Sequence, residues 1–216
     1  YGERDPQAWS ASAFVGGSPG GFEPAIDEPL RAVVINEFLV LGSPGVQEFV
    51  ELFNAGPGEA DLSECILTDD FRTNKFVIPA GTKLASGRFV SFPQAQLGFG
   101  LEPAGETLLL LGADRTAVLD VVRYGPQMPG VSSGRFPNGG IGVRLLAEPS
   151  PAASNQKPFL HNVVINEIMY HPLSEDEDDE FLELHNRGGT AADLSGWKFV
   201  DGIDFSHKVE MVIRGD

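Results

Sequence analysis

The chain repeats blocks of its own sequence, and this repeat decides what can count as one folding unit. Three blocks recur in the same order: VINE at 34–37 and 164–167, EFVELFN at 48–54 as EFLELHN at 180–186, and DLS at 61–63 and 193–195. The first block is offset by 130 residues and the other two by 132. Recurrence at a nearly constant spacing indicates a module of about 130 residues that occurs more than once.

The same period predicts the module boundaries. Ser18-Pro19-Gly20-Gly21 lies 132 residues before Ser150-Pro151-Ala152-Ala153, which closes the first module. We therefore expect residues 1–30 to be a linker and the exit segment of a preceding copy. Residues 31–157 are expected to form a complete domain, and residues 158–216 the N-terminal part of a second copy. From Ser206 onward that second copy has no match for the run from Phe76 to Thr82. Ending after its third strand would leave a sheet edge and an apolar face uncovered, so we expect lower order after residue 160 than before it.

Composition and charge narrow the class of protein. The 26 glycines and 16 prolines are spread between short apolar runs, which is typical of many short strands joined by turns. A formal charge of −16, without a Lys/Arg stripe carrying interleaved aromatic residues, argues against nucleic-acid binding. No apolar run reaches 18 residues, so no membrane span is expected. The single cysteine, Cys65, excludes an internal disulfide, and we interpret it as a small buried apolar residue.

The apolar runs of the first module predict an all-β domain. Turn residues bound seven candidate strands: 31–41, 47–54, 65–68, 75–78, 87–92, 107–111 and 117–124. Successive side chains alternate across a sheet, so Val50 and Leu52 are expected to face the core. Apolar residues do not recur at helical spacing over three turns, so no long helix is expected. Two antiparallel sheets packed face to face are the economical arrangement.

Several motifs in the first module together resemble a known family. They are INE at 35–37, EFVELFN at 48–54, DLS at 61–63, IPAGT at 78–82, GET at 105–107, GRFPNG at 134–139 and PSP at 149–151. This set resembles the lamin tail domain, an immunoglobulin-like β-sandwich. The second copy keeps the Gly196-Trp197 that the pattern expects, whereas the first has Glu64-Cys65. We expect the corner left by the missing indole to be either smaller or filled by another residue, with Phe71 as one candidate.

The resemblance also implies a role. The chain resembles the bacterial form of this domain, in which the module recurs within large secreted or surface-attached proteins. An extracellular or cell-surface location is therefore expected. It implies a non-catalytic structural or interaction module without a cofactor, whose partners include neighbouring domains of the same chain. A second interpretation is an adhesion module that binds a glycan or a protein, with or without calcium, through loop aromatics such as Phe71, Phe92, Phe99 and Phe136.

The densest charge lies in the second copy, between two expected strands. Residues 175–180 are all acidic, and clustered oxygens suit a hard cation such as calcium. The weak calcium candidates are Asp176, Asp178, Asp179 and Glu180. The spacing lacks the central glycine of a calcium loop, and a solvated turn is the simpler interpretation.

Other polar residues have structural interpretations. Glu37, Glu48 and Glu51 could form an acid–base pair, but their recurrence favours pairing with Lys or Arg, or acceptance of a backbone donor at a sheet edge. Asn36 and Asn54 are expected to bond local backbone. His161, His171, His185 and His207 lack close ligand spacing. Arg214-Gly215-Asp216 spells an adhesion triplet that we regard as accidental.

Overall fold

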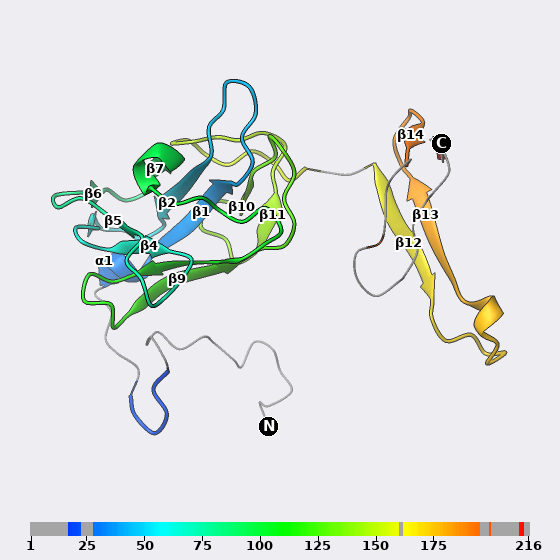
Figure 1. Cartoon of the computed structure of the whole chain (residues 1–216), viewed down its shortest axis with the longest axis horizontal. Coiled ribbons are helices and arrows are strands. Elements are labelled where there is room, and N and C mark those ends of the chain that lie inside the picture. Colours follow the sequence, from blue (N-terminus) through cyan, green and yellow to red (C-terminus); the bar gives the residue numbers. More distant parts are fainter. Residues whose placement is uncertain (1–16, 23–27, 160–161, 195–198, 200–211, 214–216) are drawn as a thin grey trace. The chain divides into compact units, whose positions relative to one another are not determined.

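The computed structural model describes residues 17–22, 28–159, 162–194, 199 and 212–213, and it contains two compact units, Tyr1–Phe159 and Leu160–Asp216 (Figure 1). Each unit is described by itself. The sequence places this boundary at 157/158. None of the helices in the described ranges is long and apolar enough to cross a membrane.

The first unit is built from two antiparallel sheets. The larger sheet has the order β11 (Val143–Leu145), β10 (Ser133–Arg135), β1 (Val33–Leu39), β2 (Phe49–Asn54) and β7 (Phe89–Pro93). The smaller sheet has the order β5 (Phe76–Val77), β4 (Ile66–Thr68), β8 (Thr107–Leu111) and β9 (Val118–Arg123). The described part of this unit also has a short strand pair, β3 (Ala60–Asp61) with β6 (Lys83–Leu84). It has two four-residue helices, α1 (Glu28–Arg31) and α2 (Gln94–Leu97).

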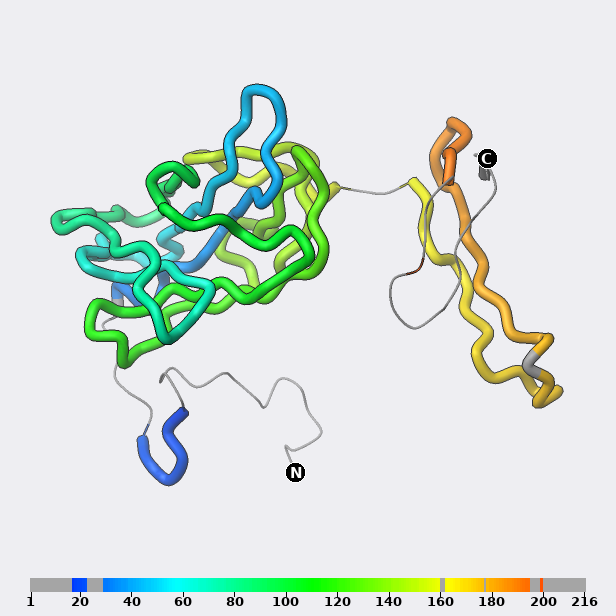
Figure 2. The backbone as a smooth tube through the Cα atoms, in the orientation of Figure 1, coloured from blue at the N-terminus to red at the C-terminus, as the bar shows by residue number. Residues whose placement is uncertain are grey.

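The hydrophobic core lies between the two sheets. The larger sheet contributes Ile35, Phe38, Val50 and Leu52, and the smaller sheet contributes Leu67, Leu108 and Leu110, all wholly buried in one cluster. Each such side chain contributes about 1.5–3 kcal/mol on burial. Val50 and Leu52 face the core as expected, and the immunoglobulin-like β-sandwich is confirmed. In Figure 2 the connection between β1 and β2, residues 40–48, extends as a long loop.

All seven predicted strands are present, and the strand at Thr107–Leu111 has the predicted bounds. Four further strands in the described part of the first unit were missed: β3, β6, β10 and β11. β3 and β6 have two residues each, too few to show alternation. β10 is Ser133-Gly134-Arg135, which has no apolar residue to mark it as a strand.

Two predictions about aromatic side chains were wrong. Phe71 does not fill the corner of the core, because its side chain is 55% exposed. Phe92 is not a loop aromatic, because it lies in β7, is buried, and packs against Phe76 with ring centroids 5.1 Å apart. Cys65 is buried as predicted.

The second unit repeats the first hairpin in structure as well as in sequence. β12 (Val163–Met169) pairs with β13 (Phe181–Asn186), and the connection contains the 3-10 turn Glu177–Asp179. Ile165 pairs with Leu184 as Ile35 pairs with Leu52, and the register shifts at the equivalent residue in both hairpins. A second short pair joins β14 (Ala192–Asp193) to β15 (Val212–Ile213).

Candidate functional site

The most concentrated chemistry in the first unit is a buried polar cluster on its larger sheet, here called the closing network. It comprises Asn36, Glu37, Glu51, Ser132, Ser150 and Asn155, all of them buried. Asn36, Glu37 and Glu51 lie on β1 and β2 in the interior of the sheet. The other three come from residues 132–155, which follow β9 in the chain. The network therefore joins the first hairpin of the module to the residues around β10 and to residues 146–157 after β11, which are called the exit segment below.

The two buried carboxylates accept hydrogen bonds from neutral donors. Glu37 accepts the Ser132 hydroxyl at 2.6 Å and both the backbone N–H and the hydroxyl of Ser150, at 3.0 and 2.8 Å. Glu51 accepts Asn36 Nδ2 at 3.1 Å and the Ala152 N–H at 2.6 Å. Of the two predicted kinds of partner, Lys or Arg was wrong for Glu37 and Glu51. The other, a backbone donor, is confirmed by the N–H groups of Ser150 and Ala152, although β1 and β2 are interior strands and not a sheet edge.

Burial sets the protonation of these carboxylates. Burial away from water raises the pKa of Glu51 to about 7, and the charge of the nearby Glu37 raises this pKa further. The hydrogen bonds from Asn36 and Ala152 lower it, but by less than burial raises it. Burial raises the pKa of Glu37 as well, although Ser132 and Ser150 oppose it. An isolated buried charge is expensive, so the pair takes up protons more readily than exposed glutamates do.

Asn36 and Asn155 join the strands to the exit segment. Asn36 Nδ2 lies 3.0 Å from Asn155 Oδ1, and Asn155 Nδ2 donates to the carbonyls of Asn36 and Arg135 at 3.0 and 2.8 Å. Gly134 permits this approach, because a Cβ there would lie 2.7 Å from both Asn155 Nδ2 and the Asn36 carbonyl oxygen. The expectation that Asn36 bonds local backbone was wrong. Asn54 does so as predicted, donating to Gly58 O at 2.8 Å.

A largely buried ion pair, whose Arg135 and Asp120 side chains are 9% and 13% exposed, links the two sheets beside this network. Arg135 Nη2, on β10, donates to both carboxylate oxygens of Asp120 on β9, each 2.9 Å away. Asp120 also accepts the Ile35 N–H at 2.7 Å, and Arg135 Nε donates to the Ile35 carbonyl at 3.0 Å. β1 pairs with β10 only at Glu37 and Phe38. At Ile35 the side chains of Asp120 and Arg135 therefore make the backbone hydrogen bonds that a neighbouring strand would otherwise make.

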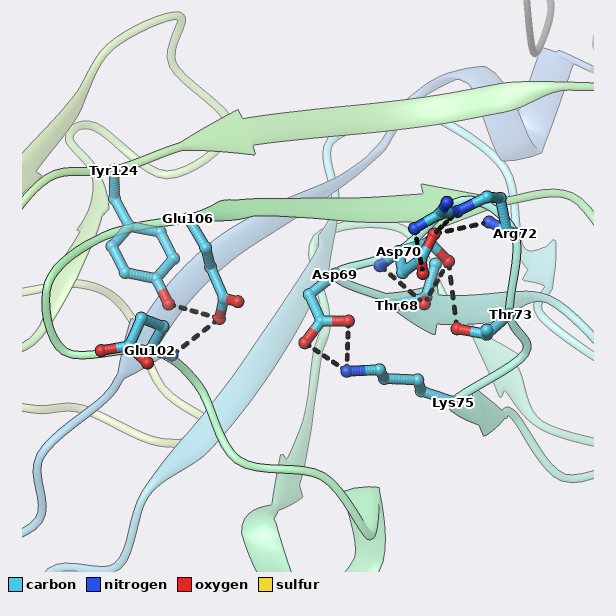
Figure 3. Close-up of polar contacts among 9 residues, drawn as sticks. All are labelled: Thr68, Asp69, Asp70, Arg72, Thr73, Lys75, Glu102, Glu106 and Tyr124. Atoms are coloured by element: carbon cyan, nitrogen blue, oxygen red, sulfur yellow. Dashed lines mark hydrogen bonds and ion pairs between the residues drawn. The ribbon is translucent and has the colours of Figure 1, made fainter.

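The polar groups around β4 and β8 stabilise turns (Figure 3). The Tyr124 hydroxyl donates to Glu106 at 2.7 Å, and the same carboxylate oxygen accepts the Glu102 N–H at 2.9 Å. Lys75 Nζ lies 2.6 Å from Asp69 and 5.4 Å from the ring centroid of Phe99.

The remaining side chains of Figure 3 close one turn locally. Arg72 pairs with Asp70 at 3.0 Å, and the Asp70 N–H donates to the Thr68 hydroxyl oxygen at 3.1 Å. These bonds connect residues two positions apart in the chain, so they fix loop conformation.

The predicted calcium ligands lie on the exposed connection between β12 and β13. Asp179 accepts the Ser174 hydroxyl at 2.6 Å, and Asp176 accepts the Asp178 N–H at 3.0 Å. Over the residues that the structure describes, no three His, Cys, Asp or Glu side chains form a group that could hold a metal ion. Calcium binding by Asp176, Asp178, Asp179 and Glu180 stays a prediction. His161, His207 and the triplet Arg214-Gly215-Asp216 lie outside the described residues.

Sequence reasoning missed Ser132, Ser150, Asn155 and the Asp120–Arg135 pair. One signal was available: Ser150-Pro151 recurs as Ser18-Pro19 at the period of the repeat. An open groove between the β1–β2 connection and α2 has Glu48 as the one titratable side chain among its lining residues. Over the described residues of this unit, the polar side chains of the closing network bond to one another and to backbone groups of the same unit.

Two antiparallel sheets pack face to face in the first unit, and the closing network bonds its first hairpin, which recurs in the second unit, to later residues of the chain. This arrangement defines an immunoglobulin-like β-sandwich module. Comparison with family models matches the Lamin Tail Domain over residues 28–126 and 157–213. The chain belongs to this family. No curated protein and no solved structure gives a significant match. The first matched stretch stops at residue 126, although β10, β11 and the exit segment belong to the same unit.

The burial of Cys65 predicts an unreactive thiol. Burial raises its pKa to about 11, so little thiolate forms at pH 8 and reagents also lack access. We expect a disulfide reagent to modify Cys65 at least about a hundredfold more slowly in the folded chain than in denaturant. A Gln96→Cys variant supplies an exposed thiol as the control. Equal rates for the two cysteines would contradict the burial.

Proposed function

We propose that this chain is a non-catalytic structural module of a large secreted or cell-surface protein, in which it spaces and displays neighbouring domains. One observation carries the proposal: the residues that the two copies share are those that build the fold. Asn36 donates to Glu51, and Asn166 makes the same contact with Glu183. A repeat that preserves folding contacts fits a spacing role better than it fits a reactive centre.

The turn after each hairpin gives further support. Asn54 Oδ1 accepts the Gly56 N–H at 2.9 Å, and Asn186 Oδ1 accepts the Gly188 N–H at 3.0 Å. Each asparagine fixes the turn that leaves its hairpin. The secreted or surface location rests on the family resemblance and on the acidic charge, which favours solubility.

A domain replacement in the gene that encodes this chain tests the spacing role. Residues 28–159 are replaced by an unrelated β-sandwich of similar length, and a second variant deletes them. The measurement is the surface exposure and the activity of the neighbouring domains. If the module is a spacer, both should be retained after replacement and lost after deletion. Loss of function in both variants would show that the surface of this module itself is required.

Adhesion is the second candidate, favoured by the exposure of Phe71 and Phe136. Exposed aromatic faces suit sugar rings and protein partners. A glycan array probed with the chain, with and without calcium, separates this role from spacing. Saturable binding lost in Phe71→Ala or Phe136→Ala would replace the spacing proposal.

A further inference from the structure

The open groove of the first unit, here called the α2 groove, has the size of a small-molecule site. Its volume is about 740 Å³, and ligand sites in proteins commonly measure about 300–1,000 Å³. One wall is the connection between β1 and β2, and the other is α2 with the residues that follow it (Figure 2). A ligand in this groove would therefore contact two segments about fifty residues apart in the chain.

Backbone hydrogen bonds hold both walls of the groove in place. Ser43 and Val46 each donate a backbone N–H to the other's carbonyl, at 3.0 and 2.9 Å, and so close the first wall. The Gln94 N–H donates to the Glu48 carbonyl at 2.9 Å, which joins the two walls. Gly98 ends α2 with φ 72°, and its N–H donates to the Gln94 carbonyl. The groove is thus formed before a ligand binds, which lowers the entropic cost of binding.

Three planar polar side chains line the groove and are available to a ligand. They are Gln47, Glu48 and Gln94. Gln47 and Gln94 are exposed and Glu48 is half-buried, and none of these side chains makes a hydrogen bond or an ion pair within the described residues. An amide both donates and accepts hydrogen bonds, and a carboxylate accepts them. Together they match hydroxyl groups, which also donate and accept.

Phe99 adds an apolar surface to these polar groups. It lines the groove, is half-buried, and packs against the hydrophobic core, so its position is fixed. An aromatic ring beside planar amides suits a sugar, which presents an apolar C–H face and a rim of hydroxyls. Lys75 Nζ lies 5.4 Å from the centroid of the Phe99 ring, and its charge disfavours a cationic ligand here.

The lining also disfavours an anion and a peptide strand. Glu48 is the one charged side chain among the lining residues, so an anion would face a carboxylate without a cation in the lining. A strand that adds to a sheet edge needs free backbone groups. The N–H groups of Ser43, Val46 and Gln94 already donate within the unit. A neutral ligand recognised by side chains fits this lining best.

Comparison of the two copies separates this groove from the fold. The connection between the repeated strands is two residues longer in the second copy, as the offset changes from 130 to 132. It carries the acidic run 175–180, where the first copy has Ser43-Pro44-Gly45-Val46-Gln47. The residues that the copies share build the hairpin, and the wall of the groove is not among them. The side chains of this wall are therefore available for binding.

We propose that the α2 groove binds a neutral oligosaccharide, with the C–H face of one sugar ring against Phe99 and its hydroxyls bonded to the side chains of Gln47, Glu48 and Gln94. Because the groove is open, it admits a sugar within a chain as well as a chain end. This binding goes beyond the spacing role and does not depend on it. It also differs from adhesion through Phe71 or Phe136, because neither residue lines the groove.

Titration of the full chain with four neutral hexasaccharides, followed by NMR, tests the proposal. The probes are cellohexaose, maltohexaose, xylohexaose and N-acetylchitohexaose. We expect saturable binding of at least one of them with a Kd below about 1 mM. The side-chain NH₂ signals of Gln47 and Gln94 should shift as it binds. Hexagalacturonate, an anionic sugar of the same length, should bind more weakly than that probe because it meets Glu48.

Substitutions locate the bound sugar. Gln47→Ala and Gln94→Ala should each weaken binding about threefold to tenfold, the usual effect of one hydrogen bond. Both side chains are exposed, so both variants should fold. Gln96→Ala is the matched control, because Gln96 is exposed on the same helix but does not line the groove. It should leave the Kd within about twofold of wild type.

Three outcomes would overturn the proposal. One is failure of all four neutral probes to bind at about 1 mM. Another is binding that Phe71→Ala or Phe136→Ala abolishes while Gln47→Ala and Gln94→Ala leave it unchanged. The third is tighter binding of hexagalacturonate than of every neutral probe. The domain replacement described above measures display of neighbouring domains, so the spacing proposal and this one can fail separately.

Discussion

Replacing Asp120 by alanine should lower the free energy of unfolding of the first unit by about 3–5 kcal/mol, the usual cost of removing one partner from a buried ion pair. The variant leaves the guanidinium of Arg135 buried without its carboxylate, and it also leaves the Ile35 N–H without its acceptor. Arg135 keeps its hydrogen bonds to backbone carbonyls, so removing Asp120 leaves a guanidinium without its counter-charge and the Ile35 N–H without its acceptor.

A double-mutant cycle separates this pair from general disruption. Arg135→Met leaves the Asp120 carboxylate buried, and the double variant removes both charges, so its loss should be smaller than the sum of the single losses. Glu59→Ala is the control, because Glu59 lies 3.5 Å from Lys83 in an exposed pair and should cost within about 0.5 kcal/mol. Urea denaturation followed by the NMR signals of Leu108 and Leu110 reports on the first unit. A loss below about 1 kcal/mol for Asp120→Ala would contradict the buried pair.

The fold was predictable where a local pattern carried it. The run Thr107–Leu111 has apolar residues bounded by turn signals, and it forms β8 with those bounds. β10 was not predictable in this way, because Ser133-Gly134-Arg135 becomes a strand through pairing with β1, about a hundred residues earlier in the chain. The prediction that Phe71 fills a corner of the core was wrong for a related reason. Hydrophobicity alone does not show which aromatic side chain of a loop remains exposed to solvent.

The polar site was half predictable. Recurrence in the two copies identified Asn36, Glu37 and Glu51 as structural residues, yet their partners Ser150 and Asn155 lie more than a hundred residues away. Nothing local distinguishes a serine that will face a buried carboxylate from one in a solvated turn. The repeat in the sequence therefore identifies the structural residues. Tertiary packing determines whether their carboxylates bind cations or accept hydrogen bonds from neutral donors.

The closing network should make the first unit less stable as the pH rises from about 4.5 to about 7. In the unfolded chain Glu51 titrates near 4.5, and in the folded unit burial raises its pKa to about 7. Between these values the folded state holds a proton that the unfolded state has released, so stability falls with pH, and above the folded pKa the slope ends. A shift of this size corresponds to about 3 kcal/mol. Burial shifts the pKa of Glu37 and Asp120 in the same direction, with Arg135 opposing it at Asp120.

Glu51→Gln isolates this effect, because the amide cannot ionise and resembles the protonated acid in shape. The fall in urea midpoint between pH 5 and pH 8 should shrink by most of the contribution from Glu51, while Glu48→Gln, half-exposed and outside the network, should retain the wild-type slope. Repulsion within the acidic chain also lowers stability as pH rises, but the two variants share it, so the difference between them reports on Glu51 alone. Asp61, Asp70 and Asp114 have lowered pKa values through their local hydrogen bonds, so they titrate below this window. Equal slopes in Glu51→Gln and wild type would mean that Glu51 stays ionised in the folded unit, and that neutral donors alone hold a buried charge.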